Sequence, residues 1–417
     1  MKLRFLARWL AVAALFLSAA SAHAYDFMSG GIYYNVLSEE DRTVEVTSRD
    51  SYSRYSGSII IPERVLAGGK TYTVTSIGEY AFYNCDALTS VTFPATLTSI
   101  GDYAFYNCYV LTSVVFPVSL MFIGDYAFYG CSALTSVDLS STSLTSIGDN
   151  AFRYCVALTS VDLSSTSLTS IGEYAFYNCD ALTSVDLSST SLTSIGNYAF
   201  WECEALTSVA FPASLTSIGY YAFQGCDALT NLTVDEGNPA FASRDNVLYS
   251  KSLDTLVCYP AGLGKEVVIP EMVRSVREDA FPGEVDTVYC QPQTPPTAVY
   301  GYFQNMFSSD ELMNAVLYVP VGTKAAYMKV DPWRNFWNIE EMDFATVGID
   351  GVAAQGVPSV TVRGGAIVVE GAAATDVVEV FAADGRCAYR GASATISHLP
   401  GGIYVVRVGK HVQKVAL

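Results

Sequence analysis

The 417-residue chain contains almost no histidine. Its three histidines are His23, His398 and His411, so none lies between residues 25 and 397. Ser-His-Asp and Cys-His catalysis and imidazole metal sites all need a histidine at the reacting centre. These kinds of chemistry are therefore excluded from the body of the protein. Chemistry by paired carboxylates stays open.

Positive charge is also scarce. The chain has 23 Lys and Arg residues against 41 Asp and Glu, giving a formal net charge of -18, and only 15% of its residues are charged. Binding to nucleic acid or to an anionic membrane surface needs clustered Lys and Arg. We therefore expect no nucleic-acid partner. A surface of hydroxyl and aromatic groups is better suited to protein or sugar ligands.

Long apolar runs are missing beyond the N-terminus. Lys2, Arg4 and Arg8 precede the apolar stretch Leu10–Leu17, and small residues end at Ala24. This pattern predicts a signal peptide over residues 1–24, with an N-terminal membrane anchor as the alternative. Since no later stretch of about 18 apolar residues exists, the sequence predicts an exported chain that does not span a membrane.

A repeat of 23 or 24 residues fills the middle of the chain. Ile-Gly pairs follow one another at spacings of 23, 23, 24, 24, 24 and 23 residues, and a cysteine eight residues after each isoleucine keeps the same spacings. Self-similarity at this period is typical of solenoids. The isoleucines are Ile77, Ile100, Ile123, Ile147, Ile171, Ile195 and Ile218, and the cysteines are Cys85, Cys108, Cys131, Cys155, Cys179, Cys203 and Cys226.

Each part of the repeat has a predicted place. Residues 111–116 read Leu-x-x-Val-x-Phe, which predicts a short strand with alternate side chains pointing inward, and Pro117 ends it because proline has no N–H. Ile100 points inward in the preceding turn, and Phe105 fills the core from a tight helical or 3₁₀ turn. The two repeat lengths differ by one residue in a loop, which leaves the strand register unchanged.

The flanking segments complete a mostly β architecture. We expect an N-terminal β cap at residues 25–70, seven repeats at 71–232, degenerate repeats and a C-terminal cap at 233–345, and a small antiparallel β-sandwich at 346–417. The C-terminal cap repeats the Ile-Gly corner at residues 276–281. An aromatic plug that includes Trp333 and Trp337 is expected to cover the open end of the solenoid.

The repeats resemble the BspA-like leucine-rich-repeat family, whose units carry the same strand, Ile-Gly corner and Ala-Phe-x-x-Cys turn. The resemblance covers about residues 59–342. It implies a leucine-rich-repeat solenoid of short parallel strands and tight helical turns. Family members with assigned roles are mostly surface adhesins. This chain lacks the asparagine of the common Leu-x-x-Leu-x-Leu-x-x-Asn repeat, so no asparagine ladder is expected.

The last 70 residues form a different pattern. Three runs between residues 360 and 381 alternate like strands, and Asp384-Gly385 predicts a hairpin turn. The end of the chain, with Gly402–Tyr404 and Lys414, resembles the C-terminal sorting domain of the type IX secretion system. That resemblance implies contact with the secretion machinery and passage to the surface of a gram-negative bacterium. An ordinary immunoglobulin-like accessory domain is the alternative.

The repeat cysteines form one column, which invites a redox or a metal interpretation. An odd column cannot pair completely, and side chains in register point the same way, whereas metal-binding thiolates converge. The sequence therefore predicts a buried, reduced column, with no cofactor. Cys258, Cys290 and Cys387 stand outside it, and a Cys258–Cys290 disulfide stays open.

Two further columns are candidate binding features. Asp138, Asp162 and Asp186 take equivalent outward positions on successive strands, where they either form a calcium-stiffened stripe or are solvated by water and nearby serines. Thr-Ser pairs on the same face suit glycan or ice contact, or are simple strand formers. These pairs begin at Thr89, Thr112, Thr135, Thr159, Thr183 and Thr207.

Aromatic residues form two columns at the repeat turns. Exposed aromatics typically anchor protein and carbohydrate partners, but rings in register also stabilise neighbouring coils by stacking. The candidate ligand contacts in the first column are Tyr80, Tyr103, Tyr126, Tyr174, Tyr198 and Tyr221. Those in the second column are Tyr83, Tyr106, Tyr129, Tyr177 and Trp201.

The functional hypothesis is a cell-surface binding protein of the adhesin type, without catalysis. It would engage host protein, other cells or glycan through repeated weak contacts at fixed spacing. A surface component that captures glycan for nutrient uptake is the second hypothesis. A hydrolase that uses the aspartates is the third.

Overall fold

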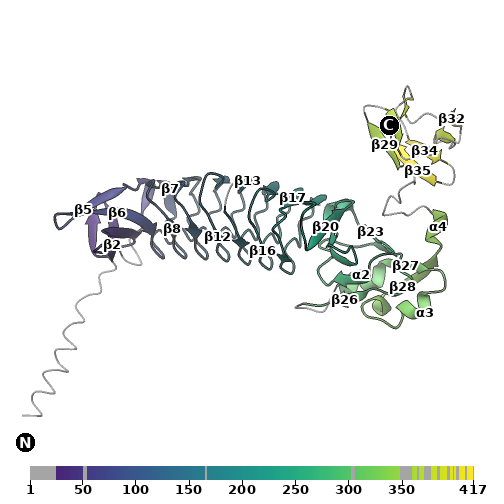
Figure 1. The fold of residues 1–417 in the computed structure, drawn as a ribbon, viewed down its shortest axis with the longest axis horizontal. Helices are drawn as coiled ribbons and strands as arrows, with labels where there is room; N and C mark the ends of the chain where they lie inside the picture. The colour runs from purple at the N-terminus through teal and green to yellow at the C-terminus, as the bar shows by residue number, and fades with distance from the viewer. Residues whose placement is uncertain are drawn as a thin grey trace, which may run out of the picture. The chain divides into compact units, whose positions relative to one another are not determined.

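The computed structural model describes residues 25–49, 54–164, 167–301, 306–347, 359–363, 366–370, 377–382, 386–391, 395–397, 399–400, 403–408 and 411–416. The expected signal peptide, residues 1–24, lies outside the described residues. The chain divides into two compact units (Figure 1). The first contains the described residues up to Ser252, with Cys258–Leu263 and Asp279–Gly283; the second contains Leu253–Val257, Gly264–Glu278 and the described residues from Glu284 onward.

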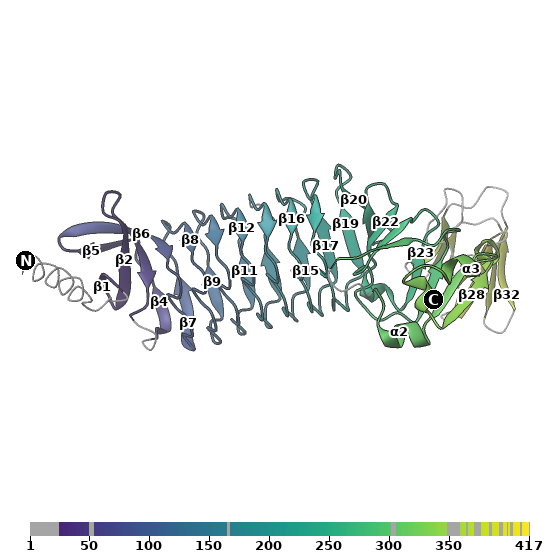
Figure 2. The same ribbon diagram turned by 90° about the horizontal axis from the view of Figure 1, so that it is seen from below.

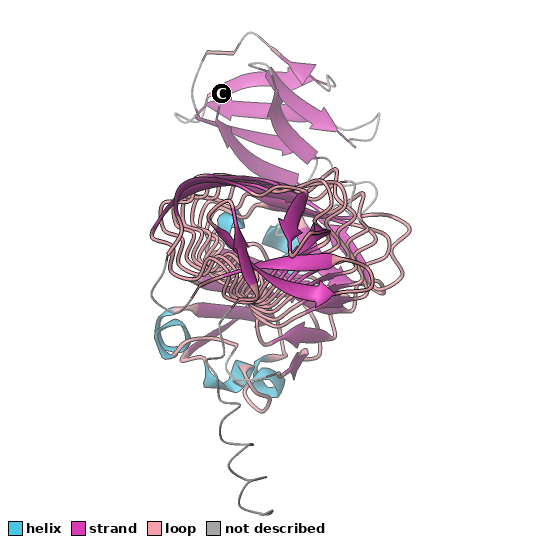
Figure 3. Ribbon diagram, turned by 90° about the vertical axis from the view of Figure 1, so that its left-hand side faces the viewer, coloured by secondary structure: helices cyan, strands magenta, loops and turns pink. Residues whose placement is uncertain are grey.

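The repeats of the first unit are coils that stack in register, as Figure 3 shows in a view down the stack. Each of these coils contributes a two-residue strand, Ser-Ile or Phe-Ile, to one row of parallel strands (Figure 2). Ile123 pairs in register with Ile100 on one side and Ile147 on the other. These strands are β8 (Ser99–Ile100), β10 (Phe122–Ile123), β12 (Ser146–Ile147), β14 (Ser170–Ile171), β16 (Ser194–Ile195) and β18 (Ser217–Ile218). The sequence placed these isoleucines in a turn, so this sheet is a new feature.

The N-terminal cap continues that same sheet. Its strands β1, β2 and β3 form an antiparallel meander, β3 pairs in parallel with β6, and β6 pairs with β8. The edge of the first coil is thereby hydrogen-bonded. The strands are β1 (Phe27–Ser29), β2 (Ile32–Ser38), β3 (Thr43–Thr47), β5 (Arg64–Ala67) and β6 (Lys70–Ile77), with β5 and β6 as a hairpin.

The predicted strand of each repeat is present in a second face, which is divided in two. One sheet has the order β4-β7-β9 and the other β11-β13-β15-β17-β19, so the strand ladder is interrupted between β9 and β11. The first 24-residue coil begins there. One continuous sheet was expected on this face because the extra residue lies in a loop, and the structure has two sheets instead. The strands are β4 (Ser56–Ile60), β7 (Ala87–Thr92), β9 (Ser113–Val115), β11 (Ser136–Asp138), β13 (Ser160–Asp162), β15 (Ser184–Asp186), β17 (Ser208–Phe211) and β19 (Asn231–Val234).

The interior of the coils is filled by the same residues in every turn. Phenylalanines at the repeat turn stack directly on one another, with ring centroids 4.7–5.7 Å apart and nearly parallel planes. Burying each ring stabilises the fold by roughly 2 kcal/mol. The predicted apolar interior is confirmed: at most 3% of each ring is exposed for Phe82, Phe105, Phe128, Phe152, Phe176, Phe200 and Phe223.

The second unit begins with a further parallel sheet, in the order β23-β25-β27-β28. A second parallel ladder joins β22, β24 and β26. Near the end of the first unit, β20 (Phe241–Arg244) and β21 (Val247–Ser250) form a hairpin. The bounds are β22 (Thr255–Cys258), η1 (Ala261–Leu263), β23 (Glu266–Ile269), β24 (Ser275–Arg277), β25 (Thr287–Cys290), β26 (Thr297–Val299), α2 (Ser309–Asn314), β27 (Val316–Pro320), α3 (Lys324–Tyr327), η2 (Trp333–Asn335), β28 (Asn338–Met342) and α4 (Phe344–Val347).

A buried aromatic cluster lies in the second unit, but its members differ from those expected. Trp333 is fully buried, and its indole Nε1 donates to the carbonyl oxygen of Pro296 at 2.6 Å. Tyr327 is buried beside it and donates its hydroxyl to the carbonyl oxygen of Pro292 at 2.6 Å. Trp337 was expected in the plug and is 75% exposed, so that prediction was wrong. Phe307 packs against Trp333 instead, and Phe336 packs against Phe307.

The C-terminal residues form the expected antiparallel sandwich. Its two sheets have the orders β29-β30-β33 and β32-β31-β34-β35, and Val369, Val380 and Val406 belong to one shared core. The predicted hairpin turn at 384–385 lies outside the described residues, although β31 and β32 pair antiparallel as it requires. The strands are β29 (Ser359–Arg363), β30 (Ala366–Glu370), β31 (Val378–Ala382), β32 (Cys387–Gly391), β33 (Thr395–Ile396), β34 (Ile403–Val408) and β35 (His411–Ala416). Among the described residues, no helix is both long and apolar enough to cross a membrane.

Candidate functional site

The turn that carries the tyrosines has an unusual backbone. Tyr103 and Asn107 adopt left-handed φ values of 54° and 58°. The N–H groups of Tyr103, Phe105 and Asn107 donate to carbonyl oxygens of the next coil at 2.8, 2.7 and 2.7 Å. A helix would keep those N–H groups within its own coil, and therefore linked tight turns form where a helical or 3₁₀ turn was expected. A left-handed residue other than glycine costs roughly 1–2 kcal/mol, which the inter-coil bonds help to offset.

The first tyrosine column is a stack with one interruption. Tyr103 lies 5.0 Å from Tyr80 and 4.7 Å from Tyr126 between ring centroids, with planes within 17°. The stack resumes at Tyr174 and Tyr198, 4.6 Å apart, and ends at Tyr221. Exposure falls from 43% for Tyr80 to 7% for Tyr198.

The second column behaves in the same way. Tyr106 stacks between Tyr83 and Tyr129 at 5.1 and 4.5 Å, and Tyr177 meets Trp201 at 5.7 Å. Burial raises the pKa of Tyr106 to about 12. Because neighbouring coils cover the ring faces, both columns present mainly ring edges and hydroxyl groups. The tyrosines of the first coil are the most exposed.

Arg153 replaces a tyrosine where the columns are interrupted. Its guanidinium carbon lies 4.4 Å from the ring centroid of Tyr177 and 5.2 Å from that of Tyr174. One guanidinium nitrogen donates to Asn150 at 3.0 Å and another to the hydroxyl of Tyr154 at 3.2 Å. Arg153 therefore joins the two halves of the aromatic columns by cation–π contact. Arg153 was not predicted as a functional residue, although its position is visible in the sequence as a break in the repeat.

The three predicted aspartates lie side by side on exposed strand positions. Asp138 pairs in register with Asp162, and Asp162 with Asp186. A carboxylate oxygen of each accepts the N–H of the serine two residues later, at 2.9–3.0 Å. Each aspartate thus stabilises its own loop. Within the described residues, no group of three or more His, Cys, Asp or Glu side chains is arranged to hold a metal ion.

A second acidic column was not predicted. The carboxylate of Asp102 accepts the N–H of Asp125 at 2.8 Å, and Asp125 and Asp149 repeat the bond to the next coil at 2.7 Å. Glu173 continues the column through the side-chain amide of Asn197 at 2.8 Å. Burial raises the pKa of Asp125, with smaller contributions from its acidic neighbours. These carboxylates cross-link successive coils.

The hydroxyl and thiol columns also bond between coils. Thr159 and Thr207 donate their hydroxyls to threonine carbonyl oxygens of the preceding coil at 2.9 and 3.0 Å, which uses the donor that an external lattice would need. The thiols of Cys108 and Cys131 donate to carbonyl oxygens at 3.1 and 3.2 Å. All seven repeat cysteines are buried and free, as predicted, and burial raises the pKa of Cys85 to about 12. The thiols of Cys258, Cys290 and Cys387 are not in a disulfide either.

The comparison with known proteins identifies the repeat. The family model of the BspA type leucine rich repeat region matches residues 71–167 and 122–252, with six copies of the repeat. The chain therefore carries BspA-type leucine-rich repeats. No curated protein matches the chain.

Several solved structures are similar to the BspA-type repeat chain. A leucine-rich cell surface protein from Faecalibacterium prausnitzii is 22% identical, with a TM-score of 0.49, and the match covers 78% of this chain and 96% of that one. The pneumococcal vaccine antigen PcpA is 22% identical, with a TM-score of 0.46 and 68% of each chain covered. A leucine-rich repeat protein from Bacteroides ovatus is 23% identical, with a TM-score of 0.45 and 76% and 77% covered.

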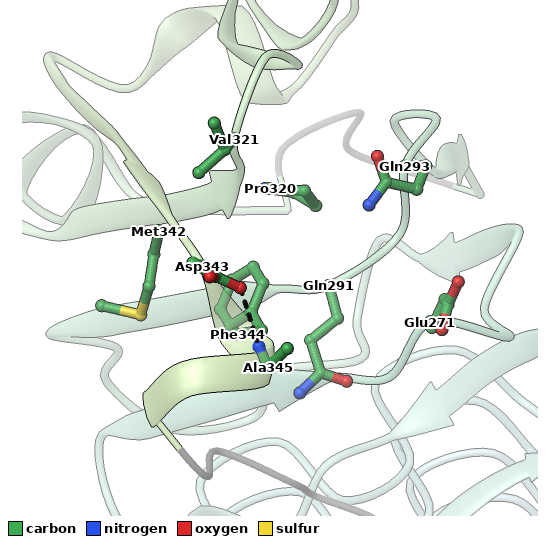
Figure 4. Close-up of a pocket in the computed structure, with 9 residues that line it drawn as sticks. All are labelled: Glu271, Gln291, Gln293, Pro320, Val321, Met342, Asp343, Phe344 and Ala345. Carbon is green, nitrogen blue, oxygen red and sulfur yellow. Dashed lines mark hydrogen bonds between the residues drawn. The ribbon is translucent and has the colours of Figure 1, made fainter.

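The second unit has a cavity of about 370 Å³ outside the BspA-type repeats (Figure 4). Asp343 and Phe344 stand on one side of it and Glu271 on the other, with Gln291 between them. A carboxylate oxygen of Asp343 accepts the N–H of Ala345 at 3.2 Å. None of the predicted site residues lines this cavity. Its residues come from distant segments without a shared motif, so the sequence offered no signal for it.

Proposed function

We propose that the chain is an exported bacterial surface protein of the adhesin type, whose BspA-type repeats bind an extracellular protein without catalysing a reaction. The observation that carries the proposal is the recurrence of Tyr, Asp and Thr at fixed positions in successive coils. A partner with several matching groups can form many weak contacts at once, and avidity then multiplies their effect.

The geometry of the tyrosine columns favours protein over glycan as the partner of the repeats. Sugars stack on open aromatic faces, whereas both ring faces of Tyr103 and Tyr106 are covered by tyrosines of neighbouring coils, with ring centroids 4.5–5.1 Å apart. The exposed ring edges and hydroxyls suit hydrogen bonds to a polypeptide. Tyr80 and Tyr83 of the first coil remain the most accessible contacts.

A glycan-capture role is the second candidate, and the cavity of the second unit favours it. Gln291, Gln293 and Asp343 offer hydrogen-bonding groups near Phe344, a combination that suits a polyol. This candidate places the glycan away from the repeats. The two candidates therefore differ in which variant abolishes binding.

Export to the surface forms part of the proposal. It is supported by the signal-like residues 1–24 and by the resemblance of Gly402–Tyr404 and Lys414 to a type IX sorting domain. Deleting residues 346–417 should leave the protein in the periplasm, because it would no longer cross the outer membrane. Fractionation of whole cells that express the full and shortened chains tests this, and equal surface exposure of both would refute the sorting role.

A binding comparison tests the ligand class. The full chain would be applied to an array of extracellular matrix proteins and to a glycan array. Tyr80→Ala with Tyr83→Ala should weaken a protein contact about tenfold or more, since aromatic anchors often contribute over 1 kcal/mol each. Gln291→Ala with Phe344→Ala is the matched pair for the cavity. Absence of binding to both arrays would refute the proposed function.

A further inference from the structure

One edge of the solenoid departs from its own repeat. The segment Val115–Phe122 connects β9 to β10 and passes from one sheet to the other. Phe122 pairs in the ladder with Ser99 on one side and Ser146 on the other. Val115 pairs with Thr92. The neighbouring coils therefore carry polar side chains at the positions of Val115 and Phe122. Folding of the coil alone does not require apolar side chains there.

The substituted side chains face solvent. Val115 is 71% exposed and Val118 is 67% exposed. Met121 and Phe122 follow at 50% and 43%. We call these four residues the apolar edge. Isolated exposed apolar residues are ordinary, but four within eight consecutive residues of a hydroxyl-rich coil favour a contact surface.

One residue of the apolar edge, Val115, is in line with a column of negative charge. Residue 115 occupies the outward strand position that Asp138, Asp162 and Asp186 take in the next three coils. All three carboxylates are exposed. Between residues 71 and 232 the sequence contains thirteen acidic residues and one basic residue, Arg153, which is held among tyrosine rings.

The negative charge of the repeats restricts which partners can bind. Two copies of this chain would repel each other across such a surface, and an anionic membrane would be repelled in the same way. A protein segment that carries both apolar and basic side chains satisfies the apolar edge and the carboxylates together. A partner with only one of these properties would leave the other half of the surface unmatched.

We infer that the apolar edge and the aspartates in line with Val115 form a docking site for a basic, amphipathic protein segment. The inference rests on the proposed function and deepens it, because it assigns one face and one partner chemistry to the binding repeats. The apolar side chains provide the contact area, and the carboxylates provide orientation and a rapid encounter. Binding through this site should weaken as salt is added.

Substitutions that copy neighbouring coils test the site with little risk to folding. Val115→Thr, Met121→Thr and Phe122→Ser, made together, restore the polar pattern of the repeat. Asp138→Asn, Asp162→Asn and Asp186→Asn remove charge and keep an oxygen acceptor. Tyr109→Ser with Val110→Ala is the matched control, since it copies the Ser132-Ala133 pair at another exposed corner.

The probe is a 14-residue peptide of alternating Leu and Lys pairs, measured by calorimetry with the full chain. Its Leu/Glu and Ser/Lys counterparts lack one property each. We expect only the Leu/Lys peptide to bind, with affinity lowered at least tenfold by the triple apolar variant and severalfold by the triple Asn variant. The control variant should bind like the unaltered protein.

Equal binding by the triple apolar variant, or binding of the Leu/Glu peptide, would overturn the inference. Concentration-dependent dimerisation that the same variant abolishes would also overturn it, by assigning the edge to a second copy. If the full chain binds a protein on the matrix array and the triple variants leave that binding unchanged, this inference fails and the proposed function stands. If the chain binds nothing on either array, the proposed function itself fails.

Discussion

Replacing the corner glycine of a central coil should open the solenoid. A Cβ atom added at Gly172 would lie 2.6 Å from the backbone nitrogen of Asp149 and 2.6 Å from the carbonyl carbon of Gly148. Ordinary contacts of this kind begin near 3.4 Å, so the two coils must separate locally by most of an ångström. The N–H of Gly172 donates to Ile147 at 2.9 Å, and that of Glu173 to Asp149 at 2.7 Å, so both bonds would stretch.

The expected cost of Gly172→Ala is about 3 kcal/mol. Overpacking accounts for roughly 1–3 kcal/mol, and weakening two hydrogen bonds adds about 1 kcal/mol. Gly237→Ala is the control, because its Cβ would meet only a carboxylate oxygen at 3.1 Å and a side-chain methyl group at 3.8 Å. Urea unfolding followed by circular dichroism compares the two. If both variants unfold at the same urea concentration as the unaltered chain, close approach of the coils is not what requires glycine.

Three further predictions concern side chains of the columns and the sandwich. A thiol reagent should modify only Cys387 in the folded protein and all ten cysteines in urea, because the other nine are buried; rapid labelling of a second thiol would contradict the buried column. Arg153→Ala should lower the free energy of unfolding by about 1–2 kcal/mol through lost cation–π contacts, whereas Arg153→Tyr should cost less because it restores the column; equal losses would show that stacking is unimportant there. Burial raises the pKa of Asp125 in the folded state. The stability that Asp125 contributes is therefore fully present when the pH is below the pKa of the unfolded chain, and it is lost as the pH rises through the pKa of the folded state. Asp125→Asn should therefore stabilise the protein by a few tenths of a kcal/mol at pH 7 and not at pH 3, as thermal unfolding at both pH values would show.

The sequence predicted those features that depend on where a side chain points. Phe105 and Cys108 recur with the repeat and are apolar, so their inward orientation follows from the need of each coil to be buried by its neighbours. The strand Ser99–Ile100 could not be predicted, since two residues show no periodicity and their hydrogen bonds come entirely from other coils. The N–H of Asp125 finds the carboxylate of Asp102 for the same reason, only after the coils have stacked.

The candidate site was predicted in part. The tyrosine and aspartate columns lie where the repeat placed them, but the sequence could not show that stacking covers the ring faces of Tyr103 and Tyr106. Trp337 was assigned to the plug on its residue type, whereas η2 directs Trp333 inward and leaves Trp337 in solvent. The cavity near Phe344 depends on segments far apart in the sequence and had no local pattern.

The coil-to-coil bonding has a mechanical consequence for a protein held at one end and pulled at the other. The hydrogen bonds of the described central coils run to the coil before and the coil after, so tension should detach these coils singly from an end. A coil of 23 residues occupies about 4.8 Å along the stack and releases roughly 75–80 Å of extended chain. The repeats would thus lengthen in steps and limit the peak force on a tether in flowing liquid. Single-molecule stretching should show a sawtooth of such increments, and one abrupt rupture of the whole stack would contradict this behaviour.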